Sequence, residues 1–189
     1  MKQWPTSREA GSAISPSIVV LTGFMGSGKT TVGQALAELL GWEFVDLDER
    51  IERDHGIPVR EIFATRGEVE FRKIEHSVLH SLLAELPSRM VIALGAGAIV
   101  QPNNLELIHQ RQALIVFLDT PIAEMVQRCG IQDFADPENP RPLAANRTAF
   151  QTLYQQRLPH YRKAHLTIAT KDKSVEKIVG ELTEKLGIG

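Results

Sequence analysis

The chain has 189 residues, of which 43% are hydrophobic and 23% are charged, as in an ordinary globular domain. Its formal net charge of −2 excludes the broad basic surface of a polynucleotide-binding protein. No stretch approaches the roughly 18 apolar residues of a membrane span, and the single cysteine, Cys129, excludes an intramolecular disulfide. We therefore expect a monomer in the reducing cytoplasm, with neither nucleic acid nor a membrane as its partner.

Residues 1–16 are rich in serine, proline, glycine and alanine, and they lack an apolar core of the kind found in secretory signals. This composition predicts a flexible N-terminal tail. No linker-like stretch or internal repeat divides the rest of the chain. We expect residues 17–189 to form one domain.

The most informative stretch follows a short apolar run at 17–22, which predicts a buried strand. Residues 23–30 read Gly-Phe-Met-Gly-Ser-Gly-Lys-Thr and fill every fixed position of the phosphate-loop pattern G-x-x-x-x-G-K-[ST]. A helix is expected over 31–40, with Gly41 as its stop. Phosphate binding needs this order of elements, because backbone N–H groups then converge on phosphate oxygens at the positive end of a helix.

Two side chains of this loop have the chemistry of a nucleotide site. Lys29 would supply a cation for the β- and γ-phosphates, and Thr30 would offer its hydroxyl to a Mg²⁺ ion. The alternative is a Gly-rich turn without function, but the flanking strand and helix favour binding of a nucleoside triphosphate. The predicted nucleotide contacts in this loop are Gly26, Ser27, Gly28, Lys29, Thr30 and Thr31.

A second acidic motif follows the first helix. Residues 42–48 predict a short strand, and alternation along it puts Asp46 and Asp48 on the same side of the chain. Two carboxylates beside a phosphate loop can hold Mg²⁺ through water and act as a base toward a substrate hydroxyl. The alternative is that Asp48 only caps a helix beginning at Glu49, because aspartate is favoured at that position.

The next region predicts a short helix over 58–66, a break at Gly67 and an amphipathic helix over 68–84. Arg72 lies near the start of the second helix and is either a solvated side chain or a ligand for a substrate anion. The predicted apolar face of this helix consists of Val69, Phe71, Ile74, Val78, Leu79, Leu82 and Leu83.

An apolar strand at 90–94 runs directly into the turn Gly95-Ala96-Gly97-Ala98. Small residues at the end of a parallel strand let a ligand approach the backbone, although a simple tight turn is the alternative. Residues 129–142 lack periodicity and predict a long loop, either a functional lid or a disordered segment, which Arg128 and Arg141 bracket. The other expected elements are helices over 103–109, 121–128, 144–163 and 174–186, and strands over 113–118 and 166–169.

Strands that alternate with helices along the chain predict an α/β fold with a parallel sheet covered on both faces. Read together, the motifs resemble the shikimate kinase family of P-loop proteins over about residues 18–186. The resemblance is carried by residues 23–33, Asp46-Leu47-Asp48, Ile51-Glu52, Ile62-Phe63, Gly67-Glu68, Phe71-Arg72-Lys73-Ile74-Glu75, Gly95-Ala96-Gly97, Arg141-Pro142-Leu143 and Arg157-Leu158-Pro159-His160-Tyr161-Arg162.

The resemblance implies that Mg·ATP phosphorylates the 3-hydroxyl of shikimate, on the route to chorismate and aromatic amino acids. It implies a three-layer P-loop kinase fold with a five-stranded parallel sheet of order 2-3-1-4-5 and a mobile lid. The implied catalytic residues are Lys29, Asp48 and Arg141. The other implied contacts are Arg128 and Arg141 for the nucleotide, Thr30 and, through water, Asp46 for the metal, and Asp48, Arg72, Gly95, Ala96, Gly97 and Arg157 for the substrate.

Two features depart from the family pattern. Ala96 stands where the family typically has a third glycine, so its methyl group could crowd the substrate ring or point away. The predicted lid is longer and more acidic than usual. These features favour a second interpretation, a kinase for another small polyol acid such as gluconate. A third interpretation, from a different class, is a non-catalytic sensor that binds shikimate or nucleotide, which the intact Lys29, Thr30 and Asp48 disfavour.

Overall fold

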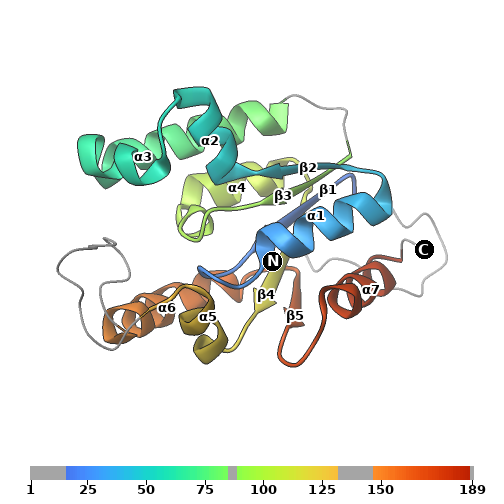
Figure 1. The fold of residues 1–189 in the computed structure, drawn as a ribbon. Coiled ribbons are helices and arrows are strands. Elements are labelled where there is room, and N and C mark those ends of the chain that lie inside the picture. Colours follow the sequence, from blue (N-terminus) through green and yellow to red (C-terminus); the bar gives the residue numbers. More distant parts are fainter. Residues whose placement is uncertain (1–15, 85–88, 132–146, 188–189) are drawn as a thin grey trace.

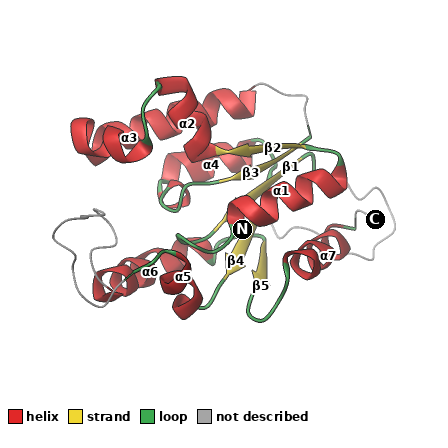
Figure 2. Cartoon of the chain, in the orientation of Figure 1, coloured by secondary structure: helices red, strands yellow, loops and turns green. Residues whose placement is uncertain are grey.

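The structure is a computed structural model that describes residues 16–84, 89–131 and 147–187. Each strand is followed by one or two helices (Figure 2). In chain order the elements are β1 (Ile18–Thr22), α1 (Lys29–Leu40), β2 (Glu43–Asp46), α2 (Leu47–His55), α3 (Val59–Ala84), β3 (Met90–Ala93), the 3₁₀ helix η1 (Ala98–Val100), α4 (Pro102–Gln110), β4 (Leu114–Asp119), α5 (Ile122–Arg128), α6 (Arg147–Tyr161), β5 (Leu166–Ala169) and α7 (Val175–Leu186).

The five strands form one parallel sheet in the order β2-β3-β1-β4-β5 (Figure 1). The central strand β1 pairs with β3 on one side and with β4 on the other, so that Val20 lies opposite both Ile92 and Ile115. The predicted fold class and strand order are confirmed. Because all the strands point the same way, the loops at their carboxyl ends meet along one edge of the sheet.

Helices cover both faces of the sheet, as alternation of the strand residues requires. Val19 and Leu21 of β1 face a core that α1 and α7 complete. Ile18 and Val20 face the larger core on the other side, to which α3, α4 and α6 contribute. The larger core includes residues of β1 to β4, and the smaller core also takes in Ile168 of β5.

The boundary between β2 and α2 differs from the prediction. The strand ends at Asp46 and the helix begins at Leu47, so Asp48 lies in the first helical turn and is neither a strand residue nor the cap. Asp46 is the N-cap, because its Oδ1 accepts the backbone N–H groups of Asp48 at 3.0 Å and Glu49 at 3.4 Å. Side-chain capping ended the strand two residues earlier than alternation suggested.

The predicted break at Gly67 is confirmed as a kink inside α3, where Gly67 has φ 78° and ψ 170°. The prediction that Val69 belongs to the apolar face is wrong, since it is 75% exposed. Two residues correspond to about 200° on a helix, so Val69 points away from the buried Phe71. Leu39 is also 63% exposed; it lines a shallow cleft between α1 and α7.

The remaining predicted elements are present with small shifts of their ends. The last helix before β5 stops at Tyr161 and not at Lys163, and the predicted start of that helix at Ala144 lies outside the described residues. The same is true of residues 1–15 and of most of the predicted lid. In the part of the chain that is described, no helix is both long and apolar enough to cross a bilayer.

Candidate active site

The phosphate loop, Gly23–Thr30, connects β1 to α1 at the carboxyl edge of the sheet. Gly26 and Gly28 have φ of 75° and 92°, in the left-handed region where a side chain would be strained. The loop is also packed tightly, because a Cβ on Gly26 would lie 2.9 Å from Cys129 Sγ. Its backbone therefore holds the curved shape that directs N–H groups toward one point in front of the helix.

Lys29 is the first residue of α1, and its side chain folds back over the loop. Its Nζ donates a hydrogen bond to the carbonyl oxygen of Phe24 at 3.0 Å. Burial lowers the pKa of Lys29 to about 8, and the nearby carboxylates of Asp48 and Asp46 act in the opposite direction. The ammonium group thus lies near the loop carbonyl of Phe24 and near two carboxylates, Asp46 at the end of β2 and Asp48 in the first turn of α2.

Asp46 joins the phosphate loop to the next strand. Its Oδ2 accepts a hydrogen bond from Thr30 Oγ1 at 2.7 Å, while its Oδ1 caps α2. The cap and the hydroxyl bond fix both oxygens of this carboxylate. The two residues predicted to lie near a metal ion are therefore adjacent. Across the described residues, no group of three or more histidine, cysteine, aspartate or glutamate side chains could form a metal site without other ligands.

Asp48 is the acidic group that lies nearest the Gly-rich turn. A Cβ on Gly95 would be 2.6 Å from Asp48 Oδ1, so glycine is required there if the carboxylate is to keep its position. Burial is the main reason that the pKa of Asp48 is raised to about 6, and the neighbouring Asp46 raises it further. A carboxyl group with such a pKa can accept a proton near neutral pH.

Arg72 lies on α3 with its guanidinium group over the same turn. Nη1 binds both carboxylate oxygens of Glu75, at 3.0 and 2.9 Å, and Nη2 binds Glu68 at 3.1 Å. The side chain is mostly buried, with the ring of Phe71 5.1 Å from Cζ. Its Nε is buried and has no hydrogen-bond partner among the described residues. The pattern-based alternative of a solvated arginine is therefore wrong.

Glu75 belongs to the sequence motif 71–75, but the motif did not indicate its role. It is fully buried, and burial raises its pKa to about 7 although Arg72 lies beside it. An acidic residue three positions after an arginine, on an otherwise apolar helix face, is the signal that could have identified it. Glu75 holds the guanidinium of Arg72 against the Gly-rich turn.

The central residue of the turn resolves the question that Ala96 raised. A Cβ on Gly97 would lie 2.8 Å from both Cζ and Nη1 of Arg72, so a side chain at either outer position would displace the group that packs on it. Ala96 is not among the residues with positive φ, and its methyl group packs against the larger core. Alanine therefore fits the middle position without strain.

Two further arginines approach the phosphate loop from other elements. Arg157 of α6 is only 9% exposed, and its Cζ lies 5.9 Å from the ring centroid of Phe24. Arg128, at the end of α5, donates from Nη1 to the carbonyl oxygen of Gly26 at 3.1 Å and pairs with Glu124 at 2.8 Å. Both arginines contact the loop, although they are about 100 or more residues away from it in sequence.

Comparison with known proteins adds to this geometry. Residues 25–187 match the model of the shikimate kinase family. The chain belongs to the shikimate kinase family. A shikimate kinase of Lactococcus lactis subsp. lactis is 41% identical over 171 residues, covering 90% of this chain and 98% of the relative. One of Chlorobium chlorochromatii is 36% identical over 182 residues, covering 90% of this chain and 91% of the relative.

Solved structures agree with this membership. Shikimate kinase from Acinetobacter baumannii in complex with shikimate has a TM-score of 0.78 and 37% identity, over 90% of this chain and 92% of that chain. A gluconokinase from Sinorhizobium meliloti 1021 has a TM-score of 0.55 at 20% identity, which shows a common fold only. Membership of the shikimate kinase family makes the chain a phosphotransferase that uses ATP, so the predicted enzyme class is confirmed.

Not every predicted site residue of this shikimate kinase family member can be placed. Arg141 lies outside the described residues, as does most of the segment predicted to be a lid. Thr31 is exposed in the first turn of α1, and Ser27 is buried with an Oγ that has no partner among the described residues. The others lie on the loop or beside it, at the carboxyl ends of β2 and β3 and on α2, α3, α5 and α6.

Two threonines that no motif indicated support the phosphate loop from behind. Thr120, just after β4, donates from Oγ1 to the carbonyl oxygen of Ser27 at 3.1 Å. Thr170, just after β5, donates to Thr120 Oγ1 at 2.8 Å. Both threonines are buried, so these hydroxyl bonds tie the ends of two strands to the loop.

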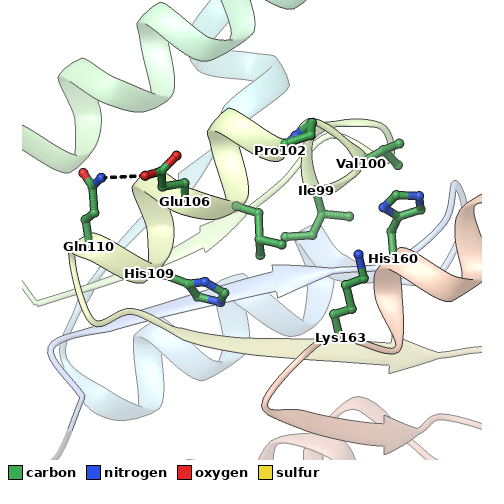
Figure 3. Close-up of a pocket in the computed structure, with 9 residues that line it drawn as sticks. Ile99, Val100, Pro102, Glu106, His109, Gln110, His160 and Lys163 are labelled. Atoms are coloured by element: carbon green, nitrogen blue, oxygen red, sulfur yellow. Dashed lines mark hydrogen bonds between the residues drawn. The ribbon is translucent and has the colours of Figure 1, made fainter. Parts of the chain in front are cut away.

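A separate cleft of about 510 Å³ lies between η1, α4 and the end of α6 (Figure 3). Ile99, Val100 and Leu105 contribute apolar walls. His160 and Lys163 lie on the α6 side. None of the predicted site residues lines it. The phosphate loop and the acceptor residues therefore form a site of their own, which this cleft does not share.

Proposed function

We propose that this enzyme transfers the γ-phosphoryl group of ATP to the 3-hydroxyl of shikimate. The observation that carries the proposal is that Asp48 and Arg72 both pack on one Gly-rich turn beside the phosphate loop. A base and a carboxylate-binding group are thus positioned on the acceptor side of a nucleotide site. The Acinetobacter baumannii relative, solved in complex with shikimate, supports the same substrate.

The phosphate loop is the proposed binding site for ATP, with Gly26, Ser27, Gly28, Lys29, Thr30 and Thr31 as its contacts and Arg128 beside the adenine. The Thr30 hydroxyl and the Asp46 carboxylate fit a Mg²⁺ ion that phosphate oxygens also hold, because Mg²⁺ in such sites takes only one or two protein ligands and keeps several waters. When bound, the ion would neutralise charge on the phosphates. Lys29 would stabilise the transferring phosphoryl group from the protein side, and Arg141 would do so from the lid.

Asp48 is the proposed base. The substrate hydroxyl gives its proton to the Asp48 carboxylate as its oxygen forms a bond to the γ-phosphorus, and the bond from that phosphorus to the bridging oxygen of ADP breaks. The raised pKa of Asp48 supports this role, because a carboxylate with a pKa of about 6 accepts a proton more readily than an ordinary aspartate.

Arg72 and Arg157 are proposed to bind the substrate carboxylate. Both guanidinium groups are largely buried, and a planar guanidinium can donate two parallel hydrogen bonds to a carboxylate. The unpartnered Nε of Arg72 adds a donor that a substrate could satisfy. Backbone atoms of Gly95, Ala96 and Gly97 would line the space between these arginines and Asp48.

The direct test measures ADP release from Mg·ATP with shikimate as the acceptor. We expect ADP release that depends on shikimate. Folded protein that shows no shikimate-dependent ADP release would contradict the proposal. Gluconate and other polyol acids in the same assay distinguish a kinase of another acid. Calorimetric binding of shikimate without turnover would instead indicate a sensor.

The activity is expected to depend on pH in a bell shape. Asp48 must be ionised, so kcat/KM should fall as pH decreases through about 6. Lys29 must be protonated, so kcat/KM should fall again as pH increases through about 8. Glu75, with a pKa of about 7, shares the acidic limb with Asp48. Initial rates at low shikimate concentration, measured as a function of pH, give kcat/KM and check this. A kcat/KM that stays constant as the pH decreases through about 6 would contradict the role of Asp48.

Replacing Gly97 by alanine is expected to displace Arg72 and to weaken the acid substrate. The new Cβ would be 2.8 Å from Arg72 Cζ, which is closer than non-bonded atoms approach. We expect KM for shikimate to rise about tenfold, as the loss of a charge-assisted contact would produce, while KM for ATP changes by less than about twofold. Gly180→Ala in α7 is the matched control, because its new Cβ would have no atom within 4 Å, and it should alter neither KM. An unchanged KM for shikimate in Gly97→Ala would argue against Arg72 as a ligand.

We also propose that residues 17–189 act as one kinase domain, with residues about 129–142 as the lid, and that the enzyme is a cytoplasmic monomer. The two cores on the faces of a single sheet support one domain. Size-exclusion chromatography with light scattering tests the monomer at the concentrations used for the assay. A dimer mass there would contradict it.

A further inference from the structure

The Gly-rich turn is held from behind by a side chain that the catalytic proposal does not use. Tyr161, the last residue of α6, donates from its hydroxyl to the carbonyl oxygen of Ala96 at 2.7 Å. The tyrosine is completely buried, and its ring stacks on Phe117 of β4 with the centroids 5.4 Å apart. Burial raises the pKa of Tyr161 above its usual range, so the phenol remains a donor throughout the working pH of the enzyme.

The position of this carbonyl matters because its neighbours on both sides pack against acceptor groups. A Cβ on Gly95 would meet Asp48, and one on Gly97 would meet Arg72, so neither contact leaves free space. Any movement of the peptide at Ala96 therefore changes the distance from the turn to the base and to the arginine. Tyr161 holds the Ala96 carbonyl, which lies between the Gly95–Asp48 contact and the Gly97–Arg72 contact.

Tyr161 also lies one helical turn from Arg157 on the same face of α6. The positive charge of Arg157 acts on the phenol and opposes the effect of burial on its pKa. The phenol is thus beside Arg157, the second proposed carboxylate ligand, while it holds the turn on which the first, Arg72 of α3, packs. The Tyr161 hydroxyl therefore lies close to both proposed carboxylate ligands, Arg157 directly and Arg72 through the turn.

The far end of the turn has its own support. Asn104 donates from Nδ2 to the carbonyl oxygen of Ala98 at 3.0 Å, and its Oδ1 is 2.7 Å from His76 Nδ1. Asn104 is fully buried. Removing the Tyr161 hydroxyl therefore releases the middle of the turn and leaves its end in place, so the enzyme should still fold.

We propose that Tyr161 is a positioning residue for the acceptor site, which sets the Gly-rich turn at the distance that Asp48, Arg72 and Arg157 require. The proposal rests on the shikimate kinase activity proposed above. It predicts an effect on the acid substrate and not on the nucleotide, because the tyrosine contacts the turn and not the phosphate loop.

The test is the Tyr161→Phe variant, which keeps the ring on Phe117 and removes only the donor. We expect KM for shikimate to rise about tenfold, because the Ala96 carbonyl loses its partner and the turn relaxes. KM for ATP should remain within about twofold of the parent value, and calorimetric binding of ADP should be unchanged. Thr183→Val is the control: it removes a hydroxyl bond to the Gly180 carbonyl on α7, 2.9 Å long, and should leave both KM values unchanged.

Three outcomes would overturn the inference. KM for shikimate could stay at the parent value, ADP binding could weaken by the same factor as shikimate, or Tyr161→Phe could be unfolded at the assay temperature by circular dichroism. The last two would make Tyr161 a residue of general stability. Failure of the proposed function is distinguishable, because the unmodified enzyme would then show no shikimate-dependent turnover.

Discussion

Asp48→Asn is expected to lower kcat by at least about a hundredfold, the usual loss when a general base is removed. Asparagine keeps the size of the side chain and its place in the first turn of α2, beside the turn at Gly95. It cannot accept the proton of the substrate hydroxyl. Steady-state ADP release at saturating ATP and shikimate measures this loss.

Glu49→Gln is the matched control for this change, because Glu49 is the next residue of α2 and its side chain is exposed. It removes the same charge from the same helical turn and should leave kcat within about twofold. The thermal midpoint of Asp48→Asn should not fall, since a buried carboxylate with a raised pKa is itself unfavourable. A kcat near the parent value in Asp48→Asn would contradict its role as base.

Lys29→Met is expected to lower kcat by about a hundredfold or more, as loss of a preorganised cation at a phosphoryl-transfer site does. The methionine keeps an unbranched apolar stem in the partly buried space that Lys29 occupies. The folded state should tolerate it, because burial already disfavours the charged form of this lysine. Stopped-assay rates and calorimetric binding of ATP, measured together, separate loss of chemistry from loss of affinity.

Lys73→Met provides the comparison for Lys29→Met. Lys73 is an exposed lysine of α3 that pairs with Glu70 at 3.0 Å, and such surface pairs contribute little to stability. We expect its kcat to equal that of the parent enzyme. If Lys29→Met were as active as Lys73→Met, the phosphate loop would not be the site of transfer.

Much of the fold was predictable because the local signals agree with the tertiary structure. The apolar run before the phosphate loop, the break at Gly67 and the glycine after α1 each gave an element or a boundary that the structure confirms. The strand order came from the family resemblance, since pairings such as that of β1 with β4 join residues far apart in the sequence.

The errors have identifiable physical causes. Alternation favoured a strand through Asp48, but capping by Asp46 began a helix two residues earlier. Val69 was assigned to the buried face by residue type, and the phase of the helix placed it in solvent. Arg72 could not be assigned from its pattern alone, because its burial depends on Glu75, whose role the motif did not reveal.

The contacts that support the site were the least predictable part. Thr170 and Thr120 lie 50 residues apart, and the hydroxyl of Tyr161 reaches a carbonyl 65 residues away. Short polar residues after a strand are common in loops of every function, so nothing local distinguishes these. Only the tertiary packing at the carboxyl edge of the sheet brings these hydroxyl groups to their acceptors.

The central strand β1 separates the residues of the site into two groups, one on each side of it in the sheet. Asp48, Arg72 and the Gly-rich turn come from the β2–β3 side of the central strand, while Arg128 and the threonine pair come from the β4–β5 side. Substitutions in α2 and α3 can thus alter which acid is accepted without touching the support of the phosphate loop. For redesign of the acceptor specificity, the segment to vary is residues 47–84 apart from Asp48, Arg72 and Glu75, while Arg157 and Tyr161 on the other side of the central strand are kept unchanged.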